Sequence, residues 1–114
     1  MALELIHYAH LGDAVWELFI REITVQKAKK ANELHKETIA LVNGEFQSLI
    51  LEKIGAFLTE EEKNLARRGR NLSCARSNKP YHRTSTAFEV LVGYWHINDK
   101  NRLNEILDNI KKLL

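Results

Sequence analysis

The chain has 114 residues and a net charge of +2, and 45% of its residues are apolar and 28% charged. A chain of this size and composition buries one core of its own and needs no disulfide staples. Its one cysteine, Cys74, cannot form an internal disulfide, and no run approaches about 18 uninterrupted apolar residues, the length that spans a membrane. Since the first residues also lack a basic leader, we expect a cytoplasmic protein that does not enter a membrane.

Helical periodicity recurs along the chain and predicts an all-α fold of five to six or more helices. No stretch alternates as a strand does and no repeat divides the chain, so residues 1–114 are expected to form a single domain. The expected helices span roughly 3–25, 32–42, 45–54, 60–68, 85–96 and 101–114.

Capping residues and one polar loop mark the helix ends. Asn32 is expected to cap the second helix, Thr59 opens a capping box for the fourth, and Ser85 or Thr84 is expected to cap the fifth. Residues 69–81 hold the only proline and are predicted to be a polar loop, the kind of segment that often carries function.

The first helix carries an acid beside its apolar face. Helical spacing predicts one buried stripe, made of Tyr8, Leu11, Val15, Leu18 and Phe19. Asp13 lies next to that stripe and is either an ion-paired surface acid or a ligand of a divalent metal. Gly12 favours the second interpretation, because a glycine inside a helix costs roughly 1 kcal/mol relative to alanine and usually marks the close approach of another backbone.

A second acid, Glu89, interrupts the apolar stripe of the fifth expected helix. Asp13 and Glu89 together could provide oxygen ligands to Mg²⁺, which binds through one or two carboxylates, waters and substrate phosphate. The alternative is two unrelated acids with partners of their own. The histidines do not show the spacing of a zinc site, and the sequence contains no P-loop or nucleophile elbow.

Basic residues gather around the predicted loop. Arg67, Arg68, Arg70 and Asn71 form a dense set of donors for phosphate, and Gly69 between them could free backbone N–H groups for the same ligand. Two other interpretations stay open: a solvated charged face, or ion pairs from Arg67 or Arg68 to the acidic run at 60–62. Lys79, His82 and Arg83 follow at the end of the loop, as further candidate phosphate contacts.

Three blocks of the chain resemble the ribonuclease III family. Leu11-Gly12-Asp13-Ala14-Val15 is similar to the signature helix of that family. The blocks at 67–71 and 84–94 resemble its Mini-ribonuclease III branch, and residues 32–36 and Gln47 also fit the pattern of that branch. The resemblance runs in order from about Leu5 to Leu107.

This resemblance implies a homodimeric endonuclease that uses Mg²⁺ or Mn²⁺ to cut double-stranded RNA, without a separate double-stranded-RNA-binding domain. In that branch the known role is maturation of large-subunit ribosomal RNA in bacteria. Asp13 matches the catalytic aspartate of the family and Glu89 its metal-binding glutamate. With no accessory domain, the RNA-binding surface is expected to come from the basic set itself: Arg67, Arg68, Arg70, Asn71, Lys79, His82 and Arg83.

The chain departs from the larger ribonuclease III enzymes at three positions where they carry acids. Those positions are Ile6, Ala9 and Thr86 here, so fewer charged ligands surround Asp13. This thinned set leaves open a non-catalytic homodimer of the same fold that binds RNA or the ribosome, and a plain helical dimerisation module. In the family the signature helix lies at the subunit interface, so Tyr8, Leu11 and Trp16 are candidate interface residues.

Overall fold

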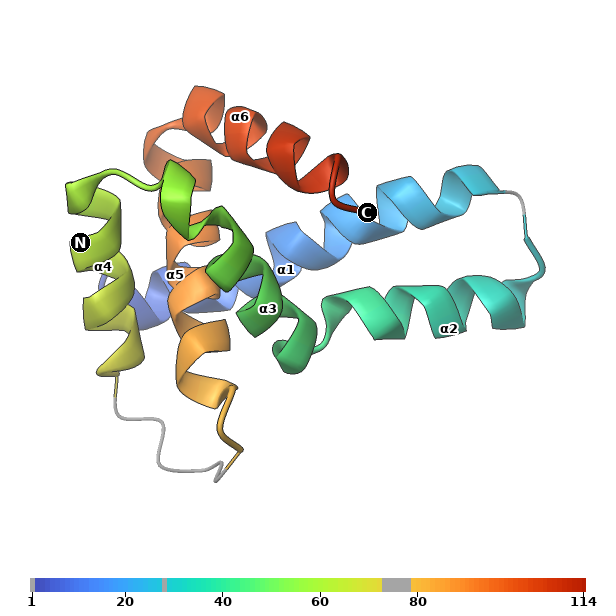
Figure 1. Cartoon of the computed structure of the whole chain (residues 1–114), viewed down its shortest axis with the longest axis horizontal. Helices are drawn as coiled ribbons and strands as arrows, with labels where there is room; N and C mark the ends of the chain where they lie inside the picture. The colour runs from blue at the N-terminus through green and yellow to red at the C-terminus, as the bar shows by residue number, and fades with distance from the viewer. Residues whose placement is uncertain (1, 28, 73–78) are drawn as a thin grey trace.

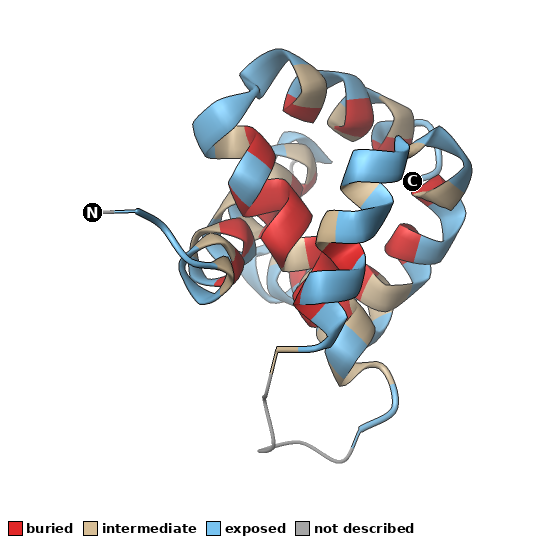
Figure 2. Cartoon of the chain, turned by 90° about the vertical axis from the view of Figure 1, so that its left-hand side faces the viewer, coloured by how far each residue is buried: buried red, intermediate tan, exposed pale blue. Residues whose placement is uncertain are grey.

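Helix α5 (His82–Asn98) runs through the middle of the protein and is contacted by α1, α3, α4 and α6 (Figure 1). The computed structural model describes residues 2–27, 29–72 and 79–114. Most of α5 between Ser85 and Trp95 is buried, and the buried residues concentrate on this central helix (Figure 2). A helix that is apolar on nearly all sides is one that other helices surround.

The described residues form helices and no strands, which confirms the predicted all-α fold. The other elements are α1 (Leu5–Thr24), η1 (Val25–Lys27), α2 (Ala31–Val42), α3 (Gly44–Ile54), η2 (Gly55–Phe57), α4 (Glu60–Arg70) and α6 (Lys100–Lys111). The protein measures 41 × 33 × 31 Å along its principal axes. No helix in the described part of the chain is long and apolar enough to cross a membrane.

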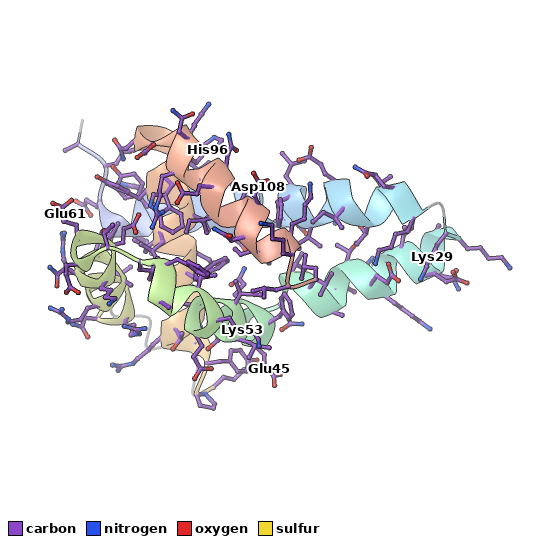
Figure 3. All side chains as sticks on the ribbon, turned by 45° about the horizontal axis from the view of Figure 1, so that its top comes forward. Lys29, Glu45, Lys53, Glu61, His96 and Asp108 are labelled. Atoms are coloured by element: carbon purple, nitrogen blue, oxygen red, sulfur yellow. The ribbon has the colours of Figure 1, made fainter. Side chains whose placement is uncertain are left out.

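The outer half of α1 lies against α2, and together they form an arm that projects from the other helices (Figure 1). Thr24 and Thr38 join the two helices through a buried hydroxyl pair 3.1 Å apart. At the tip of the arm, Lys27 and Lys29 both pair with Glu37, and Figure 3 shows Lys29 at this end.

Several predicted helix ends were wrong, among them that of α6, which ends at Lys111 and not at Leu114. Helix α2 begins at Ala31 with Lys30 as its cap, because Asn32 already lies inside the helix. Helix α5 begins at His82, and the hydroxyls of Ser85 and Thr86 donate to the His82 carbonyl at 2.9 and 3.0 Å instead of capping the helix. The capping box predicted at Thr59 is confirmed.

Helix α4 also differs from its prediction, since it continues to Arg70 instead of ending near Arg68. Gly69 is buried inside this helix, and a Cβ there would lie 3.0 Å from the Cα of Ala87 on α5. Gly69 therefore lets α4 pack against α5, and the hypothesis that it frees backbone donors for a ligand was wrong.

The buried face of α1 also differs from the predicted stripe. It consists of Ala9, Gly12, Trp16, Ile20 and Thr24, whereas the predicted core residue Leu18 is 61% exposed. The difference arises because α1 meets α5 through small residues, which turns that row inward. Trp16 is fully buried within its own chain, so its expected place at a subunit interface was wrong.

The acidic run at 60–62 does not pair with Arg67 or Arg68 in the described structure. Glu62 instead accepts hydrogen bonds from Arg102, at 2.7 and 2.8 Å, and from the indole N–H of Trp95 at 2.9 Å. This half-buried network ties the start of α4 to α5 and α6. Ion pairs between the acids at 60–62 and Arg67 or Arg68, which the sequence left open, are thereby excluded.

Gly12 and Gly93 let α1 and α5 cross at backbone contact. A Cβ on Gly12 would lie 1.8 Å from the carbonyl oxygen of Glu89, and one on Gly93 would lie 1.9 Å from the carbonyl oxygen of Tyr8. Each backbone therefore occupies the space that a side chain on the other would need. This confirms that Gly12 marks a close approach, and the approaching helix belongs to the same chain.

We predict that Gly12→Ala lowers the free energy of unfolding by about 3 kcal/mol or more, because no flexible side chain can move out of the way. Thermal unfolding followed by circular dichroism measures the effect. Gly55→Ala is the matched control: nothing lies within 4 Å of a Cβ there and the backbone is right-handed helical, so its stability should stay equal or rise slightly. Equal stability of the two variants would contradict the crossing.

Candidate active site

The crossing of α1 and α5 brings Asp13 and Glu89 together. Asp13 directly follows Gly12, which rests on the backbone of Glu89 itself. Asp13 is exposed to solvent, whereas Glu89 is half-buried beneath it. Two carboxyl groups 76 positions apart in the sequence thus meet at one point of the surface.

A cluster of aromatic rings holds the three helices of this site in place. Trp16 packs edge-on against Phe88 of α5, with ring centroids 5.0 Å apart, and stacks at 6.5 Å on Phe46 of α3. Its indole N–H donates to the carbonyl of Leu41 at 2.9 Å. Since Trp16 lies one turn after Asp13 and Phe88 directly precedes Glu89, the cluster fixes the helices that carry both acids.

The environment of Glu89 disfavours its charged form. Burial, followed by hydrogen bonding and charge repulsion from Asp13, raises the pKa of Glu89 to about 9. The amide of Gln47 on α3 acts in the opposite direction and lowers that pKa. Glu89 therefore keeps its proton at neutral pH when no cation is bound beside it.

Such a pair fits a divalent cation, because a cation beside two carboxylates replaces the proton and removes their repulsion. Asp13 and Glu89 could serve as the charged ligands of such an ion. No group of three or more His, Cys, Asp or Glu residues lies close enough to hold a metal anywhere in the described ranges. An ion at Asp13 and Glu89 would keep water molecules in its remaining positions, as Mg²⁺ commonly does.

The residues at the three positions where the larger enzymes carry acids offer no charged group in place of those acids. Ile6 is 48% exposed, Ala9 is buried, and Thr86 donates its hydroxyl to the backbone of its own helix. Gln47 on α3 also acts on Glu89, and the sequence analysis named this residue only as fitting the pattern of the branch. The available signal was an amide at a core position of the third helix, between Phe46 and Ile50.

The predicted RNA-binding residues gather at one end of the protein, where α4 ends and α5 begins (Figure 1). The arginines do not form a single cluster, however. Arg67 and Arg70 line a groove beside Leu51 of α3, whereas Arg68 lines another groove beside Tyr94 of α5. All three arginines and Asn71 are exposed, and Asn71 caps α4.

The remaining candidates lie on the α5 side of this end. Lys79 lies 5.8 Å from the centre of the Tyr81 ring, and Arg83 is exposed in the first turn of α5. His82 is half-buried, and its Nε2 makes no hydrogen bond to the described residues. Arg76 and Cys74 of the predicted loop lie outside the described residues.

Comparison with known proteins decides the family. The family described as Ribonuclease III domain matches residues 7–100. The chain belongs to the ribonuclease III family. A protein named Mini-ribonuclease 3 from Clostridium tetani is 40% identical over 106 residues, which cover 87% of this chain and 70% of the relative. One named Mini-ribonuclease 3-like protein, from Ilyobacter polytropus, is 40% identical over 109 residues, covering 89% and 84%.

The fold agrees with this assignment. An X-ray structure of a Fusobacterium nucleatum protein superposes on this chain with a TM-score of 0.83 at 30% identity, covering 96% of this chain and 92% of the other. The resemblance of the sequence to the Mini-ribonuclease III branch is thus confirmed, and the protein is an endoribonuclease of the ribonuclease III type.

We predict that Glu89→Gln stabilises the metal-free ribonuclease at high pH. Folded Glu89 holds its proton up to about pH 9, whereas the unfolded chain releases it near pH 4.5, so the stability of the wild type falls as the pH rises between these values. Glutamine is neutral throughout. Its melting temperature should therefore match that of the wild type near pH 4.5 and exceed it by about 5 °C or more near pH 8.5.

Differential scanning fluorimetry in a chelator-containing buffer measures this difference. The exposed acid Glu22 on the same helix as Asp13 provides the control, since Glu22→Gln should show no such growth with pH. A Glu89→Gln curve parallel to that of the wild type at every pH would show that Glu89 ionises normally.

Proposed function

We propose that this ribonuclease is a Mg²⁺- or Mn²⁺-dependent endonuclease of double-stranded RNA, acting as a homodimer in the cytoplasm on the precursor of large-subunit ribosomal RNA. One observation carries the proposal: Asp13 and Glu89 meet at the crossing of α1 and α5, with burial and mutual repulsion that a cation would relieve. The ribosomal substrate follows from the resemblance to the Mini-ribonuclease III branch.

In this proposal Asp13 and Glu89 hold the cation. A bound divalent ion supplies positive charge to the scissile phosphate and lowers the barrier to attack by water. Asp13 presents its carboxylate from the solvent side, where a phosphate can approach. Glu89 presents its carboxylate from the central helix, and the contact through Gly12 keeps the two acids in register.

The basic end of the protein would hold the duplex. Double-stranded RNA is recognised mainly through its shape, phosphates and 2′-hydroxyls, and exposed arginines supply donors for these groups. Arg67 and Arg70 lie in one groove and Arg68 in another, on opposite sides of the end of α4. This separation suits contacts to phosphates at different places along a duplex.

An exposed apolar face supports the homodimer. Leu3, Ile6 and Tyr94 are 46%, 48% and 37% exposed and line one groove between the start of α1 and the end of α5. Tyr8 packs edge-on against Tyr94 in the same groove, with centroids 5.5 Å apart. Arg68 also lines this groove. A second copy that buried Leu3, Ile6 and Tyr94 would therefore place Arg68 next to the subunit interface, and a two-fold pair would present two cutting sites to one duplex.

We predict that Asp13→Asn and Glu89→Gln each lower the rate of duplex cleavage by about a hundredfold or more, because each removes one of two charged ligands. The assay is cleavage of a structured double-stranded RNA with Mg²⁺ under single-turnover conditions. Asp108→Asn on the outer face of α6 (Figure 3) and Glu22→Gln are the matched controls, which should cut like the wild type.

If the Asp13→Asn variant cuts RNA as fast as the wild type, Asp13 is not part of the catalytic site. Tight duplex binding by the wild type without cutting in Mg²⁺ or Mn²⁺ would favour the non-catalytic RNA- or ribosome-binding homodimer instead.

We predict that Arg67→Gln and Arg70→Gln weaken duplex binding uniformly across sequences. Each lost phosphate contact should reduce the slope of log K against log salt by about one. Filter binding at several salt concentrations measures this slope. Lys111→Gln at the end of α6 is the control, because that lysine is exposed and lies on another helix. An unchanged slope in both arginine variants would place the RNA elsewhere.

A further inference from the structure

A buried amide beside the acidic pair has no partner of its own. Gln47 is 2% exposed on the core face of α3, and its Nε2 is buried without a hydrogen bond to any described residue. An unsatisfied buried donor of this kind destabilises the folded protein. Most buried side-chain polar atoms have a hydrogen-bond partner, so the unpaired N–H of Gln47 requires an explanation.

The packing of α3 on α5 places this amide next to Glu89. At the start of α3, a Cβ on Gly44 would lie 3.1 Å from the ring of Tyr81 and 3.2 Å from the hydroxyl of Ser85. One turn further along the two helices lie Gln47 and Glu89. The rings of Phe46 and Phe88, which precede these residues, both pack on Trp16.

The chemistry of the two groups is complementary. An amide N–H donates to a carboxylate, and it favours the ionised form of that carboxylate over the protonated form. The side-chain amide of Gln47 lies close enough to the Glu89 carboxyl group to interact with it. The ionised form is the one that a metal ligand must have.

We propose that Gln47 is a positioning residue of this site: once Glu89 is ionised, the unpaired side-chain N–H of Gln47 donates a hydrogen bond to its carboxylate and holds it in the orientation that receives a divalent cation. This inference rests on the proposed role of Asp13 and Glu89 as the metal ligands. Partners that orient a ligand from behind typically change metal affinity by about 10–100-fold when they are removed.

The test uses Gln47→Met, which keeps the length and volume of the side chain and removes the donor. Leu51→Met, one turn further along the same buried face of α3, is the matched control for a changed core. A second variant, Gln47→Leu, removes the donor with a different shape, so that one poorly folded protein does not decide the result. Circular dichroism establishes that each variant is folded.

The first readout needs no RNA: calorimetric titration with Mn²⁺, together with the rise in melting temperature that the ion produces. We expect Gln47→Met and Gln47→Leu to bind Mn²⁺ about 10–100-fold more weakly, and Leu51→Met to bind it like the wild type. The second readout is cleavage. At low Mg²⁺, Gln47→Met should lower kcat without changing KM for the duplex, and excess Mg²⁺ should restore kcat.

Unchanged Mn²⁺ affinity in both Gln47 variants would overturn the inference while leaving the proposed function intact, provided that Asp13→Asn abolishes the binding. Mn²⁺ binding that persists in the Asp13→Asn variant would instead overturn the proposed metal site, and the inference about Gln47 with it. A loss of kcat that excess Mg²⁺ does not restore would also contradict a positioning role, because it would indicate damage to the core.

Discussion

The contact of α1 and α5 through Gly12 and Gly93 is the constraint on which the rest of the site depends. At both positions the backbone of one helix fills the volume of a missing side chain on the other. This is closer than helices with ordinary side chains approach, and it leaves little freedom to slide or rotate. Gly12 positions Asp13, which directly follows it in the sequence. The carbonyl group of Glu89 rests against Gly12, and this contact positions Glu89.

The arrangement has an energetic cost at Glu89. A half-buried carboxyl group beside a second carboxyl group destabilises the folded protein wherever the pH would otherwise ionise it. The surrounding core offsets this cost, since Trp16, Phe88 and their neighbours are fully buried and tie α1, α2, α3 and α5 together. Instability confined to a functional site, within a well-packed core, is a common trade between stability and activity.

The sequence was sufficient to predict the helical fold and the close approach at Gly12 and to single out Asp13 and Glu89, because these depend on periodicity, the cost of a helical glycine and residue type. It was insufficient where tertiary contacts choose between faces. Leu18 continues an apolar stripe but lies outside because small residues turn α1 toward α5. Arg67 and Arg68 are adjacent in sequence yet face different grooves, since successive residues on a helix point about 100° apart. The sequence also does not show that the side-chain N–H of Gln47 is buried without a hydrogen-bond partner among the described residues, which only the structure reveals.

The most direct test of the central claim, that the crossing of α1 and α5 builds a metal site, is a crystal structure of the protein soaked in Mn²⁺, with the ion located by its anomalous scattering. We expect an anomalous peak within coordinating distance of carboxylate oxygens of both Asp13 and Glu89, and its loss in crystals of Asp13→Asn. Well-ordered Asp13 and Glu89 side chains with no peak between them, at an ion concentration that supports duplex cleavage, would contradict it.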